Sequence, residues 1–202
     1  MSELSELSRQ IAACTKCILH QSRVKSVPGE GPEHPQIMFI GEGPGFHENQ
    51  QGRPFVGAAG QFLEELLGLI GMKRQEVFIG NVVKCRPPGN RDPSPEEIEA
   101  CRPYLDRQIE LLAPKMIITL GRHSMARVWP NAKISQIHGQ PRKVGGILYV
   151  PMFHPAAALH QPSLRRVIED DFRKIPAWLA EMAALPDTQA PAVEQAQQLS
   201  LF

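Results

Sequence analysis

Apolar positions along the chain follow two different spacings. Short apolar runs, which are typical of buried strands, occupy residues 37–40, 77–83, 115–120 and 147–150. Around these runs apolar residues recur three and four positions apart, which predicts helices over the first dozen residues and over about 62–70, 95–112, 122–129 and 163–182. Strands that alternate with such helices indicate an α/β protein of three layers, α/β/α, with a short, mostly parallel, four-stranded central sheet.

The helix predicted from residue 95 has the clearest start. Ser94 is suited to cap it, Pro95 to occupy its first position, and Glu97 to close a capping box with Ser94. The helix is therefore expected to follow directly on the turn-rich segment 85–93, which comes after the second strand.

The composition changes near residue 183. Residues 1–182 carry the periodic patterns and are expected to form one compact domain. Residues 183–197 are rich in Ala, Pro, Gln and Thr and have few large apolar side chains, which predicts a flexible linker. Residues 198–202, Gln-Leu-Ser-Leu-Phe, are again apolar and indicate a short docking peptide at the end of that linker.

Composition and charge narrow the class of protein. Of the 202 residues 42% are hydrophobic, which is ordinary for a globular chain. No apolar run reaches the roughly 18–20 residues that span a bilayer, and no secretory signal is visible, so we expect a cytoplasmic protein that binds no membrane. The net charge is only +1, but acidic residues gather near both ends, and the modestly basic middle of the chain is compatible with a phosphate-backbone partner.

Four cysteines form an uneven set. Cys14 and Cys17 are a C-x2-C pair, whereas Cys85 and Cys101 are single residues further along the chain. Cys85 follows the second strand and Cys101 lies in the next helix, so both can approach a C-x2-C turn folded back from the N-terminal helix. Four thiolates can hold zinc or a [4Fe–4S] cluster, and one tight pair with two distant cysteines favours the cluster. A zinc ion and four unligated core cysteines remain as alternatives to the cluster. The simplest role for a metal at this place is structural.

The candidate chemistry lies where strands end. Gly41 and Gly43 flank Glu42 directly after the first strand, so that backbone amides can approach a ligand beside a confined carboxylate. Phe55 lies in the same glycine-rich loop and could stack on a flat ligand. Asn81 is an amide inside the apolar second strand, and His154 follows the fourth strand. Because loops at the carboxyl ends of parallel strands meet at one edge, these residues are expected to converge.

The ordered set of motifs resembles the uracil-DNA glycosylase superfamily, and specifically its iron–sulfur family 4. The matching pieces are Gly41-Glu42-Gly43-Pro44-Gly45, Gly52-Arg53-Pro54-Phe55-Val56-Gly57, Asn81, Lys84-Cys85-Arg86-Pro87-Pro88 and His154-Pro155-Ala156-Ala157, in that order with the four cysteines. The resemblance covers about residues 10–180 and implies the uracil-DNA glycosylase fold with a [4Fe–4S] cluster on the four cysteines.

The resemblance also implies an activity and roles. A monofunctional glycosylase of this family would flip deoxyuridine out of DNA, release uracil by hydrolysis and leave an abasic site that starts base excision repair. Phe55 would stack on the uracil and Asn81 would read its Watson–Crick edge, with backbone amides near Gly41 and Gly43 helping to hold it. His154 would stabilise the leaving uracil anion, and Glu42 would position the attacking water or stabilise the sugar cation.

Further residues are expected to contact partners. Candidates for contacts with DNA are Arg86, Arg91, Leu159, His160, Arg165 and Arg166, with Leu159 or His160 as the wedge that fills the vacated stack. The C-terminal segment is similar to the peptide by which bacterial repair proteins bind the DNA sliding clamp, with Gln198, Leu199, Leu201 and Phe202 as its contacts. The chain is expected to act as a monomer at the nucleoid.

Two other functions fit parts of the sequence. A non-catalytic iron–sulfur module on the same fold would bind nucleic acid without releasing a base. A nucleotide-binding oxidoreductase would use the cluster for electrons, but the loop after the first strand is neither a phosphate loop nor a clean dinucleotide-binding fingerprint. The glycosylase is the interpretation that accounts for all the motifs together.

Overall fold

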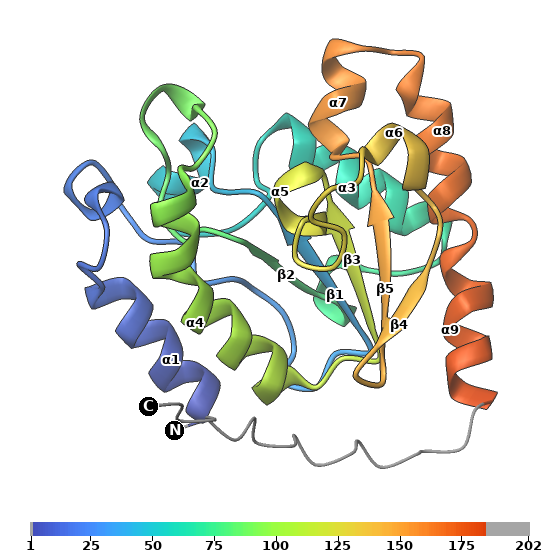
Figure 1. The fold of residues 1–202 in the computed structure, drawn as a ribbon, viewed down its shortest axis with the longest axis horizontal. Coiled ribbons are helices and arrows are strands. Elements are labelled where there is room, and N and C mark those ends of the chain that lie inside the picture. Colours follow the sequence, from blue (N-terminus) through green and yellow to red (C-terminus); the bar gives the residue numbers. More distant parts are fainter. Residues whose placement is uncertain (1, 185–202) are drawn as a thin grey trace, which may run out of the picture.

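A five-stranded sheet organises the computed structural model, which describes residues 2–184 (Figure 1). The strand order is β2-β1-β3-β5-β4, and every pairing is parallel except that of β4 with β5. The strands are β1 (Ile37–Gly41), β2 (Phe78–Asn81), β3 (Met116–Leu120), β4 (Arg142–Val144) and β5 (Ile147–Met152). The expected mostly parallel α/β architecture is therefore confirmed, with one strand more than the sequence predicted.

Helices cover both faces of the sheet. The α-helices are α1 (Glu3–Ala13), α2 (Phe46–Gln51), α3 (Ala58–Leu69), α4 (Pro95–Leu112), α5 (Arg122–Met125), α6 (Ile134–Ile137), α7 (Pro155–His160), α8 (Leu164–Phe172) and α9 (Ile175–Ala184). Three short 3₁₀ helices are η1 (Ile18–Gln21), η2 (Arg74–Glu76) and η3 (Pro88–Asn90). In Figure 1, α1 and α4 lie on one side of the sheet and α8 and α9 on the other.

The two faces of the sheet bury separate cores. Met38 and Ile40 of β1 pack with apolar residues of α1 and α4, whereas Ile37 and Phe39 pack with those of α3, α8 and α9. The Phe39 ring stacks on Phe172 of α8 at a centroid distance of 5.8 Å. Because successive side chains of a strand point to opposite faces, and both faces are covered, the strands read as continuous apolar runs in the sequence.

Several predicted elements need correction. The strand β4 was not predicted, because its three residues are all exposed and have no apolar pattern. The expected helix over 163–182 is two helices, α8 and α9, and the expected helix over 122–129 ends at Met125. The strand predicted over 77–83 ends at Asn81, and α2 and α7 lie in segments expected to be loops. None of these differences changes which strand ends carry the candidate site.

The carboxyl ends of the four parallel strands lie together, at the top of Figure 1, next to α2, α5 and α7. Within residues 2–184, no helix has the length and apolar character needed to cross a membrane. The proposed boundary at residue 182 stays a prediction, since the structure describes the chain only as far as 184.

Two glycines of α3 give a test of how tightly this helix packs. A methyl group at Gly60 would lie inside contact distance of the Phe55 backbone carbonyl, whereas a methyl group at Gly68 would meet no atom within 4 Å. We therefore expect Gly60→Ala to lower the free energy of unfolding by about 1–3 kcal/mol or more. Gly68→Ala, the matched control, should raise it by about 0.5–1 kcal/mol. Urea unfolding measures both, and similar values for the two variants would contradict the packing described here.

Candidate functional site

A cavity of about 730 Å³ opens at the carboxyl edge of the sheet. Its walls come from the segments that follow β1, β2, β3 and β5, and they include four of the predicted residues: Glu42, Phe55, Asn81 and His154. Gly43 also lines the cavity, and Gly41 lies behind Asn81 and Phe55. Four segments far apart in the sequence thus form a single site, as the parallel sheet predicts.

Asn81 is the buried polar group of this cavity. Its side chain is only 1% exposed, and its Oδ1 atom has no hydrogen-bond partner within residues 2–184. A buried amide oxygen without a partner costs free energy unless a ligand completes the hydrogen bond. A methyl group at Gly41 would lie 2.5 Å from this Oδ1 atom and 2.8 Å from the Phe55 ring. Glycine is therefore required at position 41 for Asn81 and Phe55 to approach each other.

Phe55 is held in an unusual conformation on its loop. Its φ angle is +50°, in the left-handed region that side chains other than glycine seldom adopt. The buried Arg74 donates hydrogen bonds to the carbonyl oxygens of Pro54 and Phe55. On the other side of the loop, the Glu48 Oε1 atom accepts hydrogen bonds from the Val56 and Gly57 amides at 2.9 Å each. The loop conformation thus depends on two charged side chains that the sequence did not single out.

The Phe55 ring lies beside the imidazole of His154. The two ring centroids are 5.4 Å apart and the planes are inclined by 24°. His154 caps the N-terminus of α7, where its Nδ1 atom accepts a hydrogen bond of 3.1 Å from the Ala156 amide. A neutral imidazole that accepts at Nδ1 carries its hydrogen at Nε2. Burial lowers the pKa of His154 to about 4, with a smaller opposing effect of Glu48, so the ring is a neutral donor at neutral pH.

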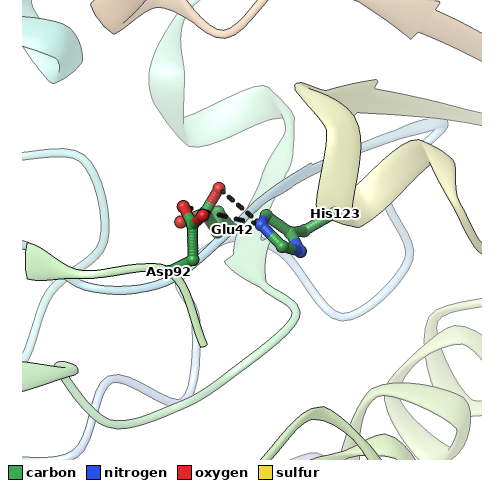
Figure 2. Close-up of side chains that lie close together, drawn as sticks. All are labelled: Glu42, Asp92 and His123. Atoms are coloured by element: carbon green, nitrogen blue, oxygen red, sulfur yellow. Dashed lines mark ion pairs between the residues drawn. The ribbon is translucent and has the colours of Figure 1, made fainter. Parts of the chain in front are cut away.

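Glu42 faces two side chains that were not predicted as site residues. The His123 Nε2 atom lies 3.6 Å from Glu42 Oε2 and 3.6 Å from Asp92 Oδ1 (Figure 2). Asp92 is ion-paired with Arg122, and Arg122 Nε is 3.2 Å from His123 Nε2. Burial raises the pKa of Glu42, as does the charge of Asp92, whereas His123 and Arg122 act in the opposite direction.

The position of Arg122 and His123 just after a strand could have revealed them as site residues. Arg122 and His123 directly follow β3, whose carboxyl end meets the same edge as those of β1, β2 and β5. The sequence analysis treated the loop after β3 only as the start of a helix. The ligand atoms of Glu42, Asp92 and His123 lie within 4.8 Å of one another, but Arg122 already neutralises Asp92 in this arrangement.

The candidate DNA contacts divide into two sets. Arg91 and His160 line the cavity, and Arg91 also pairs with Glu97 at 2.7 Å. Outside the cavity are Arg86, Leu159, Arg165 and Arg166. Leu159 is 51% exposed at the end of α7, as a wedge would need to be. The guanidinium of Arg86 lies 5.4 Å from the ring of Phe46, an exposed aromatic at the start of α2 that the sequence analysis missed.

The arginines of α8 are less available for contacts with DNA phosphates than the sequence suggested. Arg165 pairs with Glu65 and with Glu169, and its guanidinium lies over the Phe62 ring at 4.5 Å. Arg166 is highly exposed and lies 4.0 Å from Asp170. A phosphate contact by Arg165 would have to compete with two carboxylates.

The four cysteines converge on a second, smaller cavity between the N-terminal segment, the loop after β2 and α4. Cys14, Cys17, Cys85 and Cys101 all line it, and all are free thiols. Burial raises the pKa of Cys85, and that of Cys101 to about 11. A bound metal would displace the protons of these two thiols, and four cysteines around one cavity are a donor set that suits a metal centre.

Polar hydrogens already point at three of these sulfurs. The Lys16 amide lies 3.4 Å from Cys14 Sγ, Arg23 Nη1 lies 3.3 Å from Cys85 Sγ, and the Lys84 amide lies 3.3 Å from Cys101 Sγ. Hydrogen bonds of this kind stabilise negative charge on sulfur ligands. Arg23 also donates to the carbonyls of Ala12 and Cys14, and so fixes the turn that carries the C-x2-C pair. The residues present therefore fit a four-cysteine metal centre.

The predicted docking peptide, with Gln198, Leu199, Leu201 and Phe202, lies outside the described residues. Most of the predicted linker also lies there. Both interpretations rest on the sequence alone.

Comparison with known proteins identifies relatives along most of the chain. The sequence pattern of the Uracil DNA glycosylase superfamily matches residues 28–180. A type-4 uracil-DNA glycosylase of Sulfurisphaera tokodaii is 48% identical over 187 residues, which cover 87% of this chain and 84% of that protein. A type-4 enzyme of Thermotoga maritima is 43% identical, covering 88% and 95% of the two chains. A type-5 uracil-DNA glycosylase of Pyrobaculum aerophilum is more distant, at 26% identity.

The resemblance inferred from the motifs is thus confirmed by two independent matches. The matched region contains all the strands and the whole cavity at the carboxyl edge. Together with the identity to type-4 enzymes, it shows that the chain belongs to the uracil DNA glycosylase superfamily, and within it to the type-4 family.

Proposed function

We propose that this protein is a uracil-DNA glycosylase that hydrolyses the glycosidic bond of deoxyuridine in DNA. The single observation that carries the proposal is the placement of Glu42, Phe55, Asn81 and His154 around one cavity. The family and the names of the type-4 relatives support the same activity. The products would be free uracil and an abasic site, the substrate from which base excision repair continues.

Recognition of the base follows from the unpaired groups of the cavity. Uracil has a flat ring, which the Phe55 ring can cover, and an edge with one N–H donor between two carbonyl acceptors. The Asn81 Oδ1 atom, which has no partner within the described chain, would accept from that N–H group, and the amide nitrogen would donate to a neighbouring carbonyl. The site can be reached only by a base that has left the stack, so the nucleotide must be flipped.

The cleavage step separates charge, and the two sides of the cavity are matched to the two charges. As the C1′–N1 bond breaks, its electron pair moves to the uracil, whose negative charge spreads onto the carbonyl oxygen next to N1. The neutral His154 Nε2–H would donate a hydrogen bond to that oxygen. The Glu42 carboxylate would face the positive sugar and accept a proton from the water that attacks C1′. A preorganised donor such as His154 contributes about 3 kcal/mol, roughly a hundredfold in rate.

DNA is proposed to lie across the mouth of this cavity. Arg86 and Arg91 would contact phosphates on the side of the loop after β2, and Leu159 or His160 of α7 would fill the space that the flipped nucleotide leaves. Arg166 would add a phosphate contact from α8, where its exposure leaves it accessible, and Arg165 a weaker one because it is paired.

A [4Fe–4S] cluster is proposed for the four-cysteine cavity, with a structural role. Cys14, Cys17, Cys85 and Cys101 would hold it, and its contribution would be four metal–thiolate bonds that tie the N-terminal segment to β2 and α4. Hydrolysis of a glycosidic bond transfers no electrons, so the reaction itself does not call on the cluster. Zinc is the alternative, and the metal analysis described below distinguishes them.

The end of the chain is proposed to bind the DNA sliding clamp. Leu201 and Phe202 would enter an apolar pocket, with Gln198 and Leu199 at its rim, and residues 183–197 would act as the tether between the clamp and the catalytic domain, residues 1–182. A monomer in the cytoplasm, working at the nucleoid, fits this arrangement.

The activity is tested by uracil release from a duplex oligonucleotide with one deoxyuridine. We expect multiple turnovers by the purified protein and a decrease of about a hundredfold or more in kcat for His154→Ala, because the donor to the uracil anion is lost. Affinity for the duplex should change little. Binding without release by the unaltered protein would favour the non-catalytic module, and equal losses of affinity and rate in His154→Ala would indicate misfolding instead.

The metal centre is tested by spectroscopy and metal analysis of protein purified without oxygen. We expect a brown protein with about four iron and four sulfide per chain. Cys85→Ala should lose the colour and much of the soluble yield, whereas Tyr104→Phe, which changes the same cavity without removing a thiol, should keep both. One zinc per chain, or a colourless Cys85→Ala variant that remains soluble and fully active, would contradict the structural cluster.

The docking peptide is tested by deleting residues 198–202. The shortened chain should release uracil from a short duplex at the rate of the full chain and lose measurable binding to the purified sliding clamp of the same organism. Replacing Gln198 by Ala should weaken binding less than replacing Leu201 and Phe202, because the apolar contacts provide most of the affinity. Clamp binding that survives the deletion would place the contact elsewhere on the protein.

A further inference from the structure

His123 occupies a fixed place beside Glu42. It lies in the first turn of α5, directly after the N-cap residue Gly121, whose φ angle is +90°. The Gly121 backbone is close to His154: a methyl group there would lie 3.3 Å from the His154 Cβ atom. The start of α5 therefore lies close to His154, and His123 of the same turn lies beside Glu42.

The His123 Nε2 atom lies close to two carboxylate oxygens and to one N–H donor. Two carboxylate oxygens, Glu42 Oε2 and Asp92 Oδ1, both lie at 3.6 Å, as the dashed lines of Figure 2 show. The Arg122 Nε–H group lies at 3.2 Å and donates to this nitrogen when the imidazole is neutral. A protonated imidazole would instead present a hydrogen to the two carboxylates. His123 is also the most buried of the three residues in Figure 2, with 19% of its side chain exposed.

We propose that His123 is a positioning residue that orients the Glu42 carboxylate and keeps it ionised for its work on water and the sugar cation. This inference rests on the proposed function of the same cavity. Asp92 and Arg122 complete the arrangement: Asp92 Oδ1 lies 3.6 Å from His123 Nε2, and Arg122 is ion-paired with Asp92. The residue acts through Glu42 and touches neither base nor sugar.

The chemistry of the reaction explains why such a residue is needed. Glu42 can accept a proton or stabilise a cation only as a carboxylate, and burial raises its pKa. The charge of a protonated His123 at 3.6 Å acts in the opposite direction and favours the ionised form of Glu42. Without His123, the charge of Asp92 would still raise the pKa of Glu42, and only the smaller effect of Arg122 would lower it.

The charged surroundings of Glu42 determine the expected dependence on pH. His123 and Arg122 face it from α5, and Asp92 faces it from the loop between β2 and α4. The other titratable side chains that line the cavity are Glu48, Arg91, His154 and His160. Burial lowers the pKa of His154, whereas burial raises that of Glu42, so the two groups are expected to respond to pH in different ranges.

The test compares kcat and KM over pH 5–9 for the unaltered protein, His123→Leu and His123→Gln. We expect His123→Leu to lower kcat about tenfold near neutral pH, to leave KM almost unchanged and to move the acid limb of the profile to higher pH, because the Glu42 pKa rises. His123→Gln keeps an N–H group near the Nε2 position, so it should restore most of kcat at high pH. It carries no charge, so its acid limb should stay at a higher pH than that of the unaltered protein.

A control and a second measurement separate this inference from the proposed function. His34→Asn changes an exposed histidine before β1, at the other end of the strand, and should leave kcat and the profile unchanged. The Glu42 pKa itself can be followed by the carboxyl carbon chemical shift of glutamate-labelled protein, with the signal assigned by its loss in Glu42→Gln. This value should be higher in His123→Leu than in the unaltered protein.

The outcomes lead to different conclusions. An unchanged Glu42 pKa and an unchanged pH profile in His123→Leu would overturn the positioning role, while uracil release by the unaltered protein would still support the proposed function. If the unaltered protein releases no uracil but the Glu42 pKa rises in His123→Leu, the pairing is upheld and the proposed reaction is wrong. A loss of duplex affinity equal to the loss of kcat in His123→Leu would count against the role proposed here.

Discussion

The pairing of β1 with β2 is the constraint on which the candidate site depends. Gly41 and Asn81 are register partners at the last pair of these strands, and the Phe55 ring packs against both. Because Gly41 has no side chain, the Asn81 amide and the aromatic ring can share a space that any other residue would fill. A slip of one residue between the strands would turn Asn81 toward the opposite face of the sheet and remove the polar edge of the cavity.

This arrangement has a cost that other contacts must offset. Asn81 buries a carbonyl oxygen without a partner in the described chain, Phe55 adopts a left-handed conformation, and His154 is kept neutral by burial. The first two of these features each destabilise the folded state by an amount on the order of 1–3 kcal/mol. The buried Arg74 and the side chain of Glu48 fix the Phe55 loop from two sides, and two apolar cores support the sheet beneath it. The Asn81 oxygen, which has no hydrogen-bond partner in the described chain, is a group that a bound base would supply with one.

The sequence predicted the parts of the fold that depend on local patterns. The Ser94-Pro95 helix start is where it was expected, and its capping box with Glu97 is formed. The apolar runs marked the parallel strands because burial on both faces leaves few polar positions in them. The exposed strand β4 has no such pattern, and its pairing with β5 depends on the tight connection between them, which residue periodicity does not report.

The candidate site was predictable where glycines and isolated polar residues stood at strand ends, as with Glu42, Asn81 and His154. Arg74 and Glu48 were not, because their partners are backbone groups of the Phe55 loop, whose conformation the sequence does not show. His123 lies at a strand end and was missed because it looks like any histidine in a helix until Glu42 and Asp92 are placed beside it. Charge relationships across loops arise from the tertiary fold, so they cannot be read from the order of residues.

Lys84 connects the two sites of the molecule. Its amide donates to Cys101 Sγ, while its Nζ atom, fully buried, donates to the Asn81 carbonyl oxygen at 2.8 Å and to Gln108 Oε1 at 2.6 Å. Lys84 is isolated from water, and this burial lowers its pKa to about 8, with a smaller opposing effect of Cys101. The segment that follows Asn81 is therefore fixed between the strand and the cysteine cavity. A metal centre in the cysteine cavity, as proposed above, would supply no electrons to the reaction but would anchor the backbone from which the Asn81 amide projects.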